Sequence, residues 1–250
     1  MPDPRHLRNA PITEAIFDFR VKARAGFHSE EFTSLQSRLT SRFPKMDPRR
    51  MAQAIIRVGG QQSQPPVVQD LGMQGYFFKA ADEKMIAQFR VDGFTFNRLR
   101  PYTSWEELFP LVLELWQLYS GVARPEVITR LALRYINRVP LPLGPASFET
   151  YLQSAPIVPP ELPQFVSNFL TRLTIHDPDM DIAAHITQAF QGEVNMSGRQ
   201  QIVILDIDAF KQGEFAIDDP SIKETFHRLR DFKNRIFFSS LTEETVRQFE

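Results

Sequence analysis

The segment Glu14–Lys22 reads E-A-I-F-D-F-R-V-K and alternates apolar with polar residues. Phe17 and Phe19 are apolar members of this pattern. Asp18 lies between them, and Arg20 follows Phe19. A period of two places one set of side chains on one face of a strand and the other set on the opposite face. We therefore predict a half-buried β-strand with Phe17 and Phe19 turned toward the core.

A similar alternation returns at Leu131–Ile136. The first half of the chain can be aligned with the second at an offset of 116 residues, which becomes 117 at the start of a predicted helix. The matched positions are Phe17 with Leu133, Asp92–Phe94 with Asp208–Phe210, and Ser104 with Ser221. Each half then reads β-α-β-β-β-α, which predicts a duplication, although short apolar matches also arise by coincidence. The expected fold is α+β, with antiparallel sheets that merge or pack and helices on one face. The two halves, 1–124 and 125–250, are expected to form one integrated globular module.

Helix signals appear in three places. Residues 29–43 carry apolar residues at helical spacing, and Pro44 ends the pattern. Ser104 and Ser221 are each followed three positions later by Glu, which is the arrangement of a capping box. The connection 59–72 is rich in Gln, Pro and Gly and is expected to be an exposed loop.

Composition limits the classes of function. The 250 residues include 29 Lys plus Arg and 30 Asp plus Glu, a net charge of -1, which disfavours nucleic acid and anionic membranes as partners. Cysteine is absent, which excludes thiolate nucleophiles and agrees with a reducing compartment. Met1–Ala10 is charged, and no segment has the roughly 18 consecutive apolar residues that indicate a membrane helix. We therefore expect a cytoplasmic protein.

The familiar catalytic motifs are missing from the sequence. It contains no G-x-S-x-G elbow, no phosphate-binding G-x-x-x-x-G-K, no dinucleotide fingerprint and no H-E-x-x-H. The 22 Phe residues suit a large aromatic core. The sequence therefore predicts no catalytic residue and no cofactor, and it favours a non-enzymatic role.

Arg134, Tyr135 and Arg138 form the strongest polar cluster for ligand binding. Two guanidinium groups on one strand could hold a carboxylate or a phosphate. The alternative is that the arginines form cross-strand ion pairs with acids such as Asp18 or Asp92.

Four residues are candidates for metal binding. Asp206 and Asp208 lie two apart on a predicted strand and could hold a divalent cation from one face, or they could form its solvent-facing side. His176 and His185 flank a predicted turn and could face each other across a hairpin, or they could be ordinary exposed strand residues.

Several motifs together resemble a sporadically distributed prokaryotic protein family of about 250 residues. The stretches that carry the resemblance are 10–15 (A-P-I-T-E-A), 99–107 (L-R-P-Y-T-S-W-E-E), 133–139 (L-R-Y-I-N-R-V), 162–164 (L-P-Q), 205–210 (L-D-I-D-A-F) and 241–242 (L-T). The chain departs from the family pattern at Ala10, where the family usually has Pro. The resemblance implies no catalytic residue, cofactor or substrate.

Two functions from different classes follow from these observations. The first is a protein-binding or regulatory module without catalytic activity, which docks a protein partner or a second copy of itself. The second is a small-ligand-binding protein or enzyme with a pocket between sheet and helices, addressed by Arg134, Tyr135 or Arg138. A weaker third idea, an accessory role in a prokaryotic defence or toxin-type system, rests only on the patchy distribution of the family.

Overall fold

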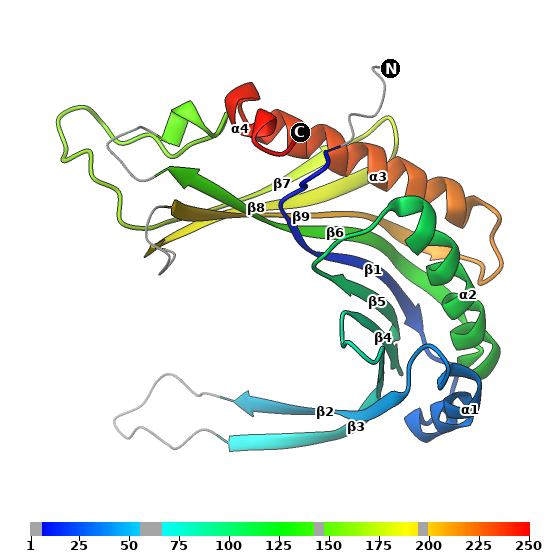
Figure 1. The fold of residues 1–250 in the computed structure, drawn as a ribbon. Helices are drawn as coiled ribbons and strands as arrows, with labels where there is room; N and C mark the ends of the chain where they lie inside the picture. The colour runs from blue at the N-terminus through cyan, green and yellow to red at the C-terminus, as the bar shows by residue number, and fades with distance from the viewer. Residues whose placement is uncertain (1–6, 56–66, 143–147, 195–199) are drawn as a thin grey trace.

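The computed structural model describes residues 7–55, 67–142, 148–194 and 200–250. Within these ranges nine strands form one antiparallel sheet in the order β2-β3-β4-β5-β1-β6-β9-β8-β7 (Figure 1). The strands are β1 (Ile12–Lys22), β2 (Lys45–Ile55), β3 (Val67–Lys79), β4 (Met85–Arg90), β5 (Gly93–Leu99), β6 (Val127–Pro142), β7 (Phe169–Asp177), β8 (Ile182–Val194) and β9 (Gln200–Phe215).

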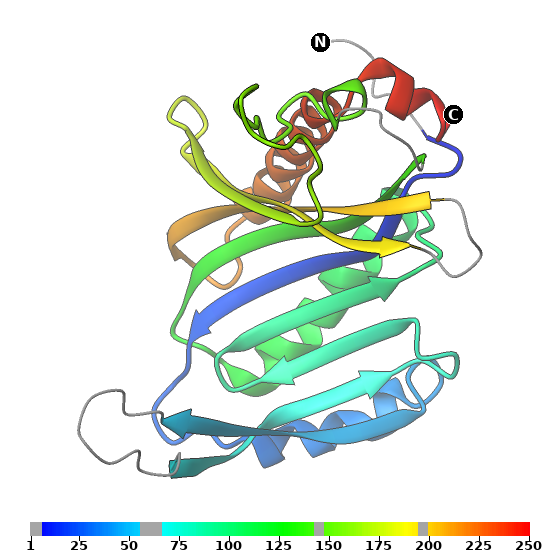
Figure 2. The same cartoon turned by 90° about the vertical axis from the view of Figure 1, so that its left-hand side faces the viewer.

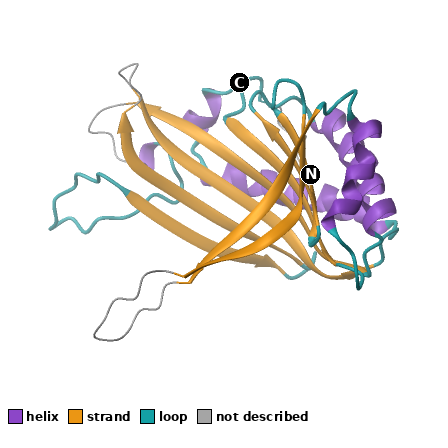
Figure 3. Ribbon diagram, turned by 90° about the horizontal axis from the view of Figure 1, so that it is seen from below, coloured by secondary structure: helices purple, strands orange, loops and turns teal. Residues whose placement is uncertain are grey.

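The helices lie on the outer, convex side of a strongly curved sheet (Figures 1 and 3). Figure 2 looks onto the concave face, with the long helices behind it. The described helices are η1 (Ser29–Leu35), α1 (Gln36–Leu39), α2 (Trp105–Ala123), η2 (Phe148–Thr150), α3 (Ser221–Ser240) and α4 (Glu243–Arg247). None of the helices in the described ranges is long and apolar enough to cross a membrane.

The alternation in β1 explains where the core lies. Phe17 and Phe19 have no exposed surface, and their rings meet aromatic side chains of both long helices. The ring centre of Phe17 lies 6.0 Å from that of Phe226 on α3, and Phe19 stacks on Trp116 of α2 at 4.4 Å. Because the apolar face of the sheet is buried against α2 and α3, the α+β class and the placement of helices on one face are confirmed.

The two halves of the chain meet in the middle of the sheet. β1 and β6 are antiparallel neighbours, and Phe17 lies directly opposite Leu133. The first half supplies β1 to β5 and the second half supplies β6 to β9, so the chain forms one continuous sheet. In the first half four strands, β2 to β5, follow the first helical segment, one more than the predicted β-α-β-β-β-α pattern, whereas three strands, β7 to β9, follow η2 in the second half.

Parts of the predicted register and capping are wrong. Asp92 lies in the β4–β5 turn, whereas Asp208 lies in the middle of β9, opposite Arg134 of β6 in the backbone register. Ser104 does cap α2, since its Oγ accepts a hydrogen bond from the Glu107 amide at 3.2 Å. The first turn of α3 already contains Ser221, and its amide donates to Asp219 Oδ1 instead. An Asp one residue before Pro220 thus takes the role that the sequence pattern gave to Ser221.

Two further boundaries differ from expectation. The helix predicted over 29–43 ends at Leu39 and begins as a 3₁₀ helix. The loop predicted over 59–72 includes the first residues of β3, which begins at Val67, and positions 59–66 lie outside the described residues.

Candidate functional site

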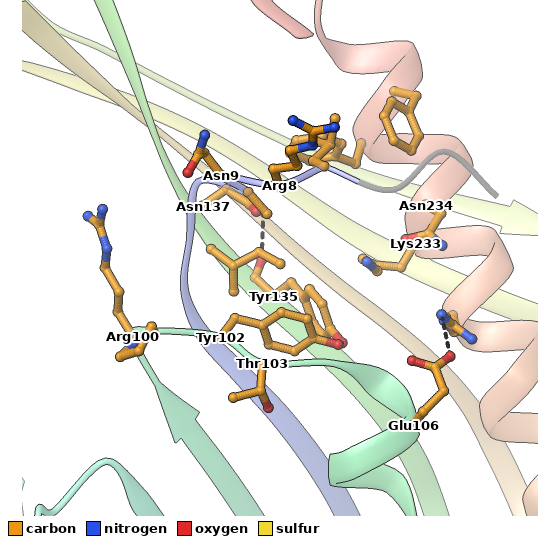
Figure 4. A pocket seen from close by; sticks show the side chains of 17 residues that line it. Arg8, Asn9, Arg100, Tyr102, Thr103, Glu106, Tyr135, Asn137, Lys233 and Asn234 are labelled. Carbon is orange, nitrogen blue, oxygen red and sulfur yellow. Dashed lines mark hydrogen bonds and ion pairs between the residues drawn. The ribbon is translucent and has the colours of Figure 1, made fainter. Parts of the chain in front are cut away.

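A pocket of about 510 Å³ opens on the helix-covered side of the sheet (Figure 4). It lies between β6, α3, the start of α2 and the chain segment Leu7–Ala10. Two backbone hydrogen bonds hold that segment in place: the Asn9 amide donates to the Phe249 carbonyl at 3.0 Å, and the Arg138 amide donates to the Pro11 carbonyl at 2.9 Å. Backbone contacts with Phe249 and with β6 therefore fix the segment that forms one wall of the pocket.

Lys233 is the most unusual residue of this pocket. Its place on α3, four residues after Leu229 and three before Ile236, belongs to the buried face of that helix. Only 7% of the residue is exposed. Its Nζ lies 3.8 Å from the centre of the Tyr135 ring, which is cation–π distance. Among the described residues no carboxylate or hydrogen-bond acceptor pairs with this amine.

The surroundings of Lys233 alter its protonation. Burial, together with the positive charge of Arg230 one turn earlier on α3, lowers the pKa of its amine to about 7. A buried lysine that lacks a counterion is thus a neutral amine for a substantial fraction of the time near pH 7.

Two tyrosines form a hydroxyl pair beside the amine. The Oη atoms of Tyr102 and Tyr135 are 2.9 Å apart, and their rings are 5.4 Å apart. Burial raises the pKa of both phenols, so both stay protonated at neutral pH. Tyr102 comes from the β5–α2 connection and Tyr135 from β6, so the pair joins two walls of the pocket.

The charge of the pocket is positive. Arg8, Arg100, Arg230 and Lys233 line it, and Glu106 is the single acid among the described lining residues. Arg230 Nη2 lies 3.2 Å from Glu106 Oε1, which leaves three cations without a carboxylate in the pocket wall. Such a surface attracts an anion.

The predicted ligand cluster is divided between the two faces of the sheet. Tyr135 lines the pocket, whereas Arg134 lies on the concave face and pairs with Asp206, with Nε to Oδ1 at 2.8 Å. The alternation of β6 places Arg138 on the same face as Arg134. Arg134 does form an ion pair with an acid on a neighbouring strand, as one alternative predicted. The partner is Asp206, whereas the acids named in that prediction were Asp18 and Asp92.

Guanidinium groups engage both candidate metal-binding aspartates. Asp208 accepts two hydrogen bonds from Arg130 Nη2, at 2.9 and 2.8 Å, and Asp206 is held by Arg134. A third acid, Asp18, is buried on the same face and accepts hydrogen bonds from Thr95 and from Arg90. These paired charges form a row across the central strands on the concave face.

His176 and His185 do not face each other, and this expectation is wrong. The hairpin register pairs His176 with Ala183 and His185 with Thr174, whose Oγ1 lies 2.9 Å from His185 Nδ1. Asp177 and Ile182 are the pair nearest the turn, so the two histidines are offset by two positions in the register of the hairpin. Within the described ranges no three His, Asp or Glu side chains converge as metal ligands would.

Sequence reasoning missed Lys233, Tyr102 and Arg230. A readable signal existed for Lys233, because a lysine at this position interrupts the apolar stripe that runs along α3. Nothing in the local pattern marks Tyr102, whose role depends on how the β5–α2 connection crosses β6.

No protein-family model matches this chain, and no curated protein sequence matches it. The family resemblance, the cytoplasmic location and the accessory role in a defence or toxin-type system therefore stay predictions from the sequence. The geometry of the pocket becomes the main guide to function.

Proposed function

We propose that this protein binds a small organic acid in the pocket around Lys233. One observation carries the proposal: a lysine that is 7% exposed faces a cavity and has no acidic partner among the described residues. An unpaired ammonium group in such a place raises the free energy of the folded protein. A ligand carboxylate would supply the missing countercharge and would thereby gain affinity.

The size and lining of the pocket agree with this ligand class. A volume of about 510 Å³ lies within the range of roughly 300–1,000 Å³ that is typical of small-molecule sites. The rings of Tyr135, Phe237 and Phe238 supply apolar walls, and the lining cations supply positive charge. We therefore expect an acid that also carries an apolar or aromatic group.

Benzoate tests this expectation, with benzyl alcohol and benzylamine as neutral and cationic analogues. We expect benzoate to raise the melting temperature of the protein, because a ligand that binds only the folded state stabilises it. Both analogues should have a much smaller effect. The change Lys233→Met should weaken benzoate binding, measured by titration calorimetry, by about tenfold or more, as the loss of a charge-assisted contact predicts.

Lys223→Met is the matched control, since Lys223 is an exposed lysine on the same helix. This variant should bind benzoate as the unaltered protein does. Equal binding of the acid and the alcohol, or full retention of affinity in Lys233→Met, would refute the proposal.

The β7 edge supports a second candidate function, protein binding. Leu170, Leu173 and Ile175 on this outermost strand are exposed, at 72%, 55% and 36%. The opposite outer strand β2 instead begins with the charged and proline-containing run 45–50, K-M-D-P-R-R, which discourages pairing. An open strand edge with exposed apolar side chains is typical of a site where another strand adds.

We propose that the occupant of this edge is β7 of a second copy. Antiparallel pairing centred on Leu173 places Leu173 opposite its counterpart and Thr171 opposite Ile175, on the same face. Arg172 then lies opposite Thr174, so no like charges are opposed. A two-fold axis of this kind is the commonest symmetry of soluble oligomers.

Sedimentation at micromolar concentration tests this pairing. The protein should sediment as a dimer, and Leu173→Lys should make it a monomer because the axis would bring two lysines together. Met51→Lys introduces the same charge on the exposed surface of β2 and should leave the dimer intact. A monomeric unaltered protein, or a dimer unaffected by Leu173→Lys, would disprove the model.

We also propose that the two halves of the chain derive from a duplication and fold as one module. Outward from the central pair, the first half contributes β1-β5-β4-β3-β2 and the second half contributes β6-β9-β8-β7, each followed by a long helix. The proposed equivalent positions Phe17 and Leu133 are direct cross-strand partners. This arrangement supports an approximate two-fold relation about that pair.

A further inference from the structure

We propose that Lys233 forms a reversible imine with a ligand that carries both a carboxylate and a ketone or aldehyde group, that is, a small oxo acid. This inference rests on the proposed acid-binding function and adds a covalent step to it. The site has the three components that imine formation requires: an unpaired amine, a nearby proton donor and positive charge for the anionic end of the ligand.

The amine is presented in the state that the reaction needs. An ammonium group has no lone pair, so only the neutral amine attacks a carbonyl carbon. Lys233 is buried on a long helix, has no acidic partner among the described residues and lies next to Arg230, and each of these features disfavours the ammonium form. Figure 4 shows its side chain extending from α3 into the pocket, toward Tyr135.

The hydroxyl pair supplies a route for protons. Lys233 Nζ lies over the ring of Tyr135, and the Tyr135 hydroxyl is hydrogen-bonded to that of Tyr102. Both phenols are protonated at neutral pH because burial raises the pKa of each. A phenol beside the amine can donate a proton and can recover one through its hydrogen-bonded neighbour.

The step balances without any further reactant. The lone pair of Nζ attacks the carbonyl carbon, the carbonyl electrons pass to oxygen, and a proton moves from nitrogen to that oxygen to give the carbinolamine. The nitrogen lone pair then expels the hydroxyl group, which leaves as water after protonation through the tyrosine pair. Expulsion of water leaves a protonated imine and a tyrosine phenolate. Transfer of the remaining nitrogen proton to the phenolate gives the neutral imine and restores the phenol. Hydrolysis reverses the sequence, so the bond is transient.

The guanidinium groups explain why an oxo acid is preferred to a simple aldehyde. Arg8 and Arg100 line the same cavity and have no carboxylate partner in its wall, so they favour a ligand carboxylate there. A carboxylate held by these groups brings the adjacent carbonyl to the amine and raises its effective concentration. Phenylglyoxylate has the aromatic ring, the ketone and the carboxylate in one molecule, which makes it a suitable probe.

Borohydride trapping tests the proposal on the complete chain. The protein is incubated at pH 7.5 with phenylglyoxylate and sodium cyanoborohydride, which reduces an imine to a stable secondary amine. Intact-mass measurement should show a single adduct, and peptide mapping should place it on Lys233. Exposed lysines such as Lys223 lie outside the pocket, where no bound carboxylate brings the carbonyl to the amine, and should carry at least about tenfold less label. Benzaldehyde, which lacks the carboxylate, should label Lys233 more slowly.

The variant Lys233→Arg locates the adduct, because it keeps a cation at this position but has no amine that can form an imine. It should lose the adduct. If benzoate binds the unaltered protein but Lys233 is not labelled above Lys223, the imine is refuted and the acid-binding function stands. If benzoate does not bind and labelling is uniform over the lysines, both are refuted.

Discussion

Replacing Phe226 by alanine is expected to lower the free energy of unfolding by about 3–5 kcal/mol, the usual loss for truncating a fully buried aromatic residue. Phe226 has no exposed surface. Its ring centre lies 5.0 Å from that of Phe19 on β1 and 5.6 Å from that of Phe109 on α2. The substitution therefore opens a cavity where the sheet and both long helices meet, and urea denaturation measures the loss.

Asp231→Ala is the matched control for this prediction, because Asp231 is an exposed residue of the same helix. It should change the free energy of unfolding by no more than about 0.5 kcal/mol. A loss below about 1 kcal/mol for Phe226→Ala would contradict the packing of α3 against the sheet.

Lys233→Met should stabilise the protein at pH 6 and progressively less toward pH 10. Methionine keeps most of the packing of the lysine chain without its charge. The folded pKa of Lys233 is about 7 and its ordinary value is 10.5. Below pH 7 the amine is protonated in both folded and unfolded protein, so the full penalty of burying the charge applies. Between pH 7 and 10.5 the unfolded chain binds more protons, so the stability of the unaltered protein rises with pH.

The size of this effect has an upper limit of about 5 kcal/mol, obtained by converting the fall in pKa of Lys233 to free energy. Urea denaturation of both proteins at pH 6, 8 and 10 measures the gap. The other ionisable groups that face Lys233 are present in both proteins, so the difference between the two curves reports on Lys233 itself; these groups are Arg230, Glu106, Tyr102 and Tyr135. A gap that does not change with pH, or a variant less stable at pH 6, would show that the Lys233 amine is not buried as described.

Much of the fold could be predicted because it depends on local periodicity. The alternation around Phe17 and around Leu133 identifies two strands and their buried faces, and the helical spacing after Ser221 identifies α3. The register between distant strands could not be obtained in this way. Asp92 and Asp208 have similar neighbours in the sequence, but one lies in a turn and the other in mid-strand, because strand length is set by pairing across the sheet.

The candidate site was harder to predict because its parts come from segments that only the tertiary structure brings together. Arg134 and Tyr135 are adjacent in sequence, yet the pleat sends one to the concave face and the other to the pocket. The sequence marks Tyr135 only because Arg134 and Arg138 lie near it, and it does not reveal the hydrogen bond between the hydroxyl groups of Tyr135 and Tyr102. Lys233 could have been recognised from its position in an apolar stripe, but its lack of a counterion is visible only in three dimensions.

The difference between the two outer strands also bears on how large an assembly can become. If two copies join through β7, each free end of the combined sheet is a β2 strand that carries Lys45, Pro48 and Arg49. Charge and proline at those ends oppose the addition of a third chain. The same sheet that is able to pair once would then be unable to polymerise, so the protein would resist fibril growth even at high concentration.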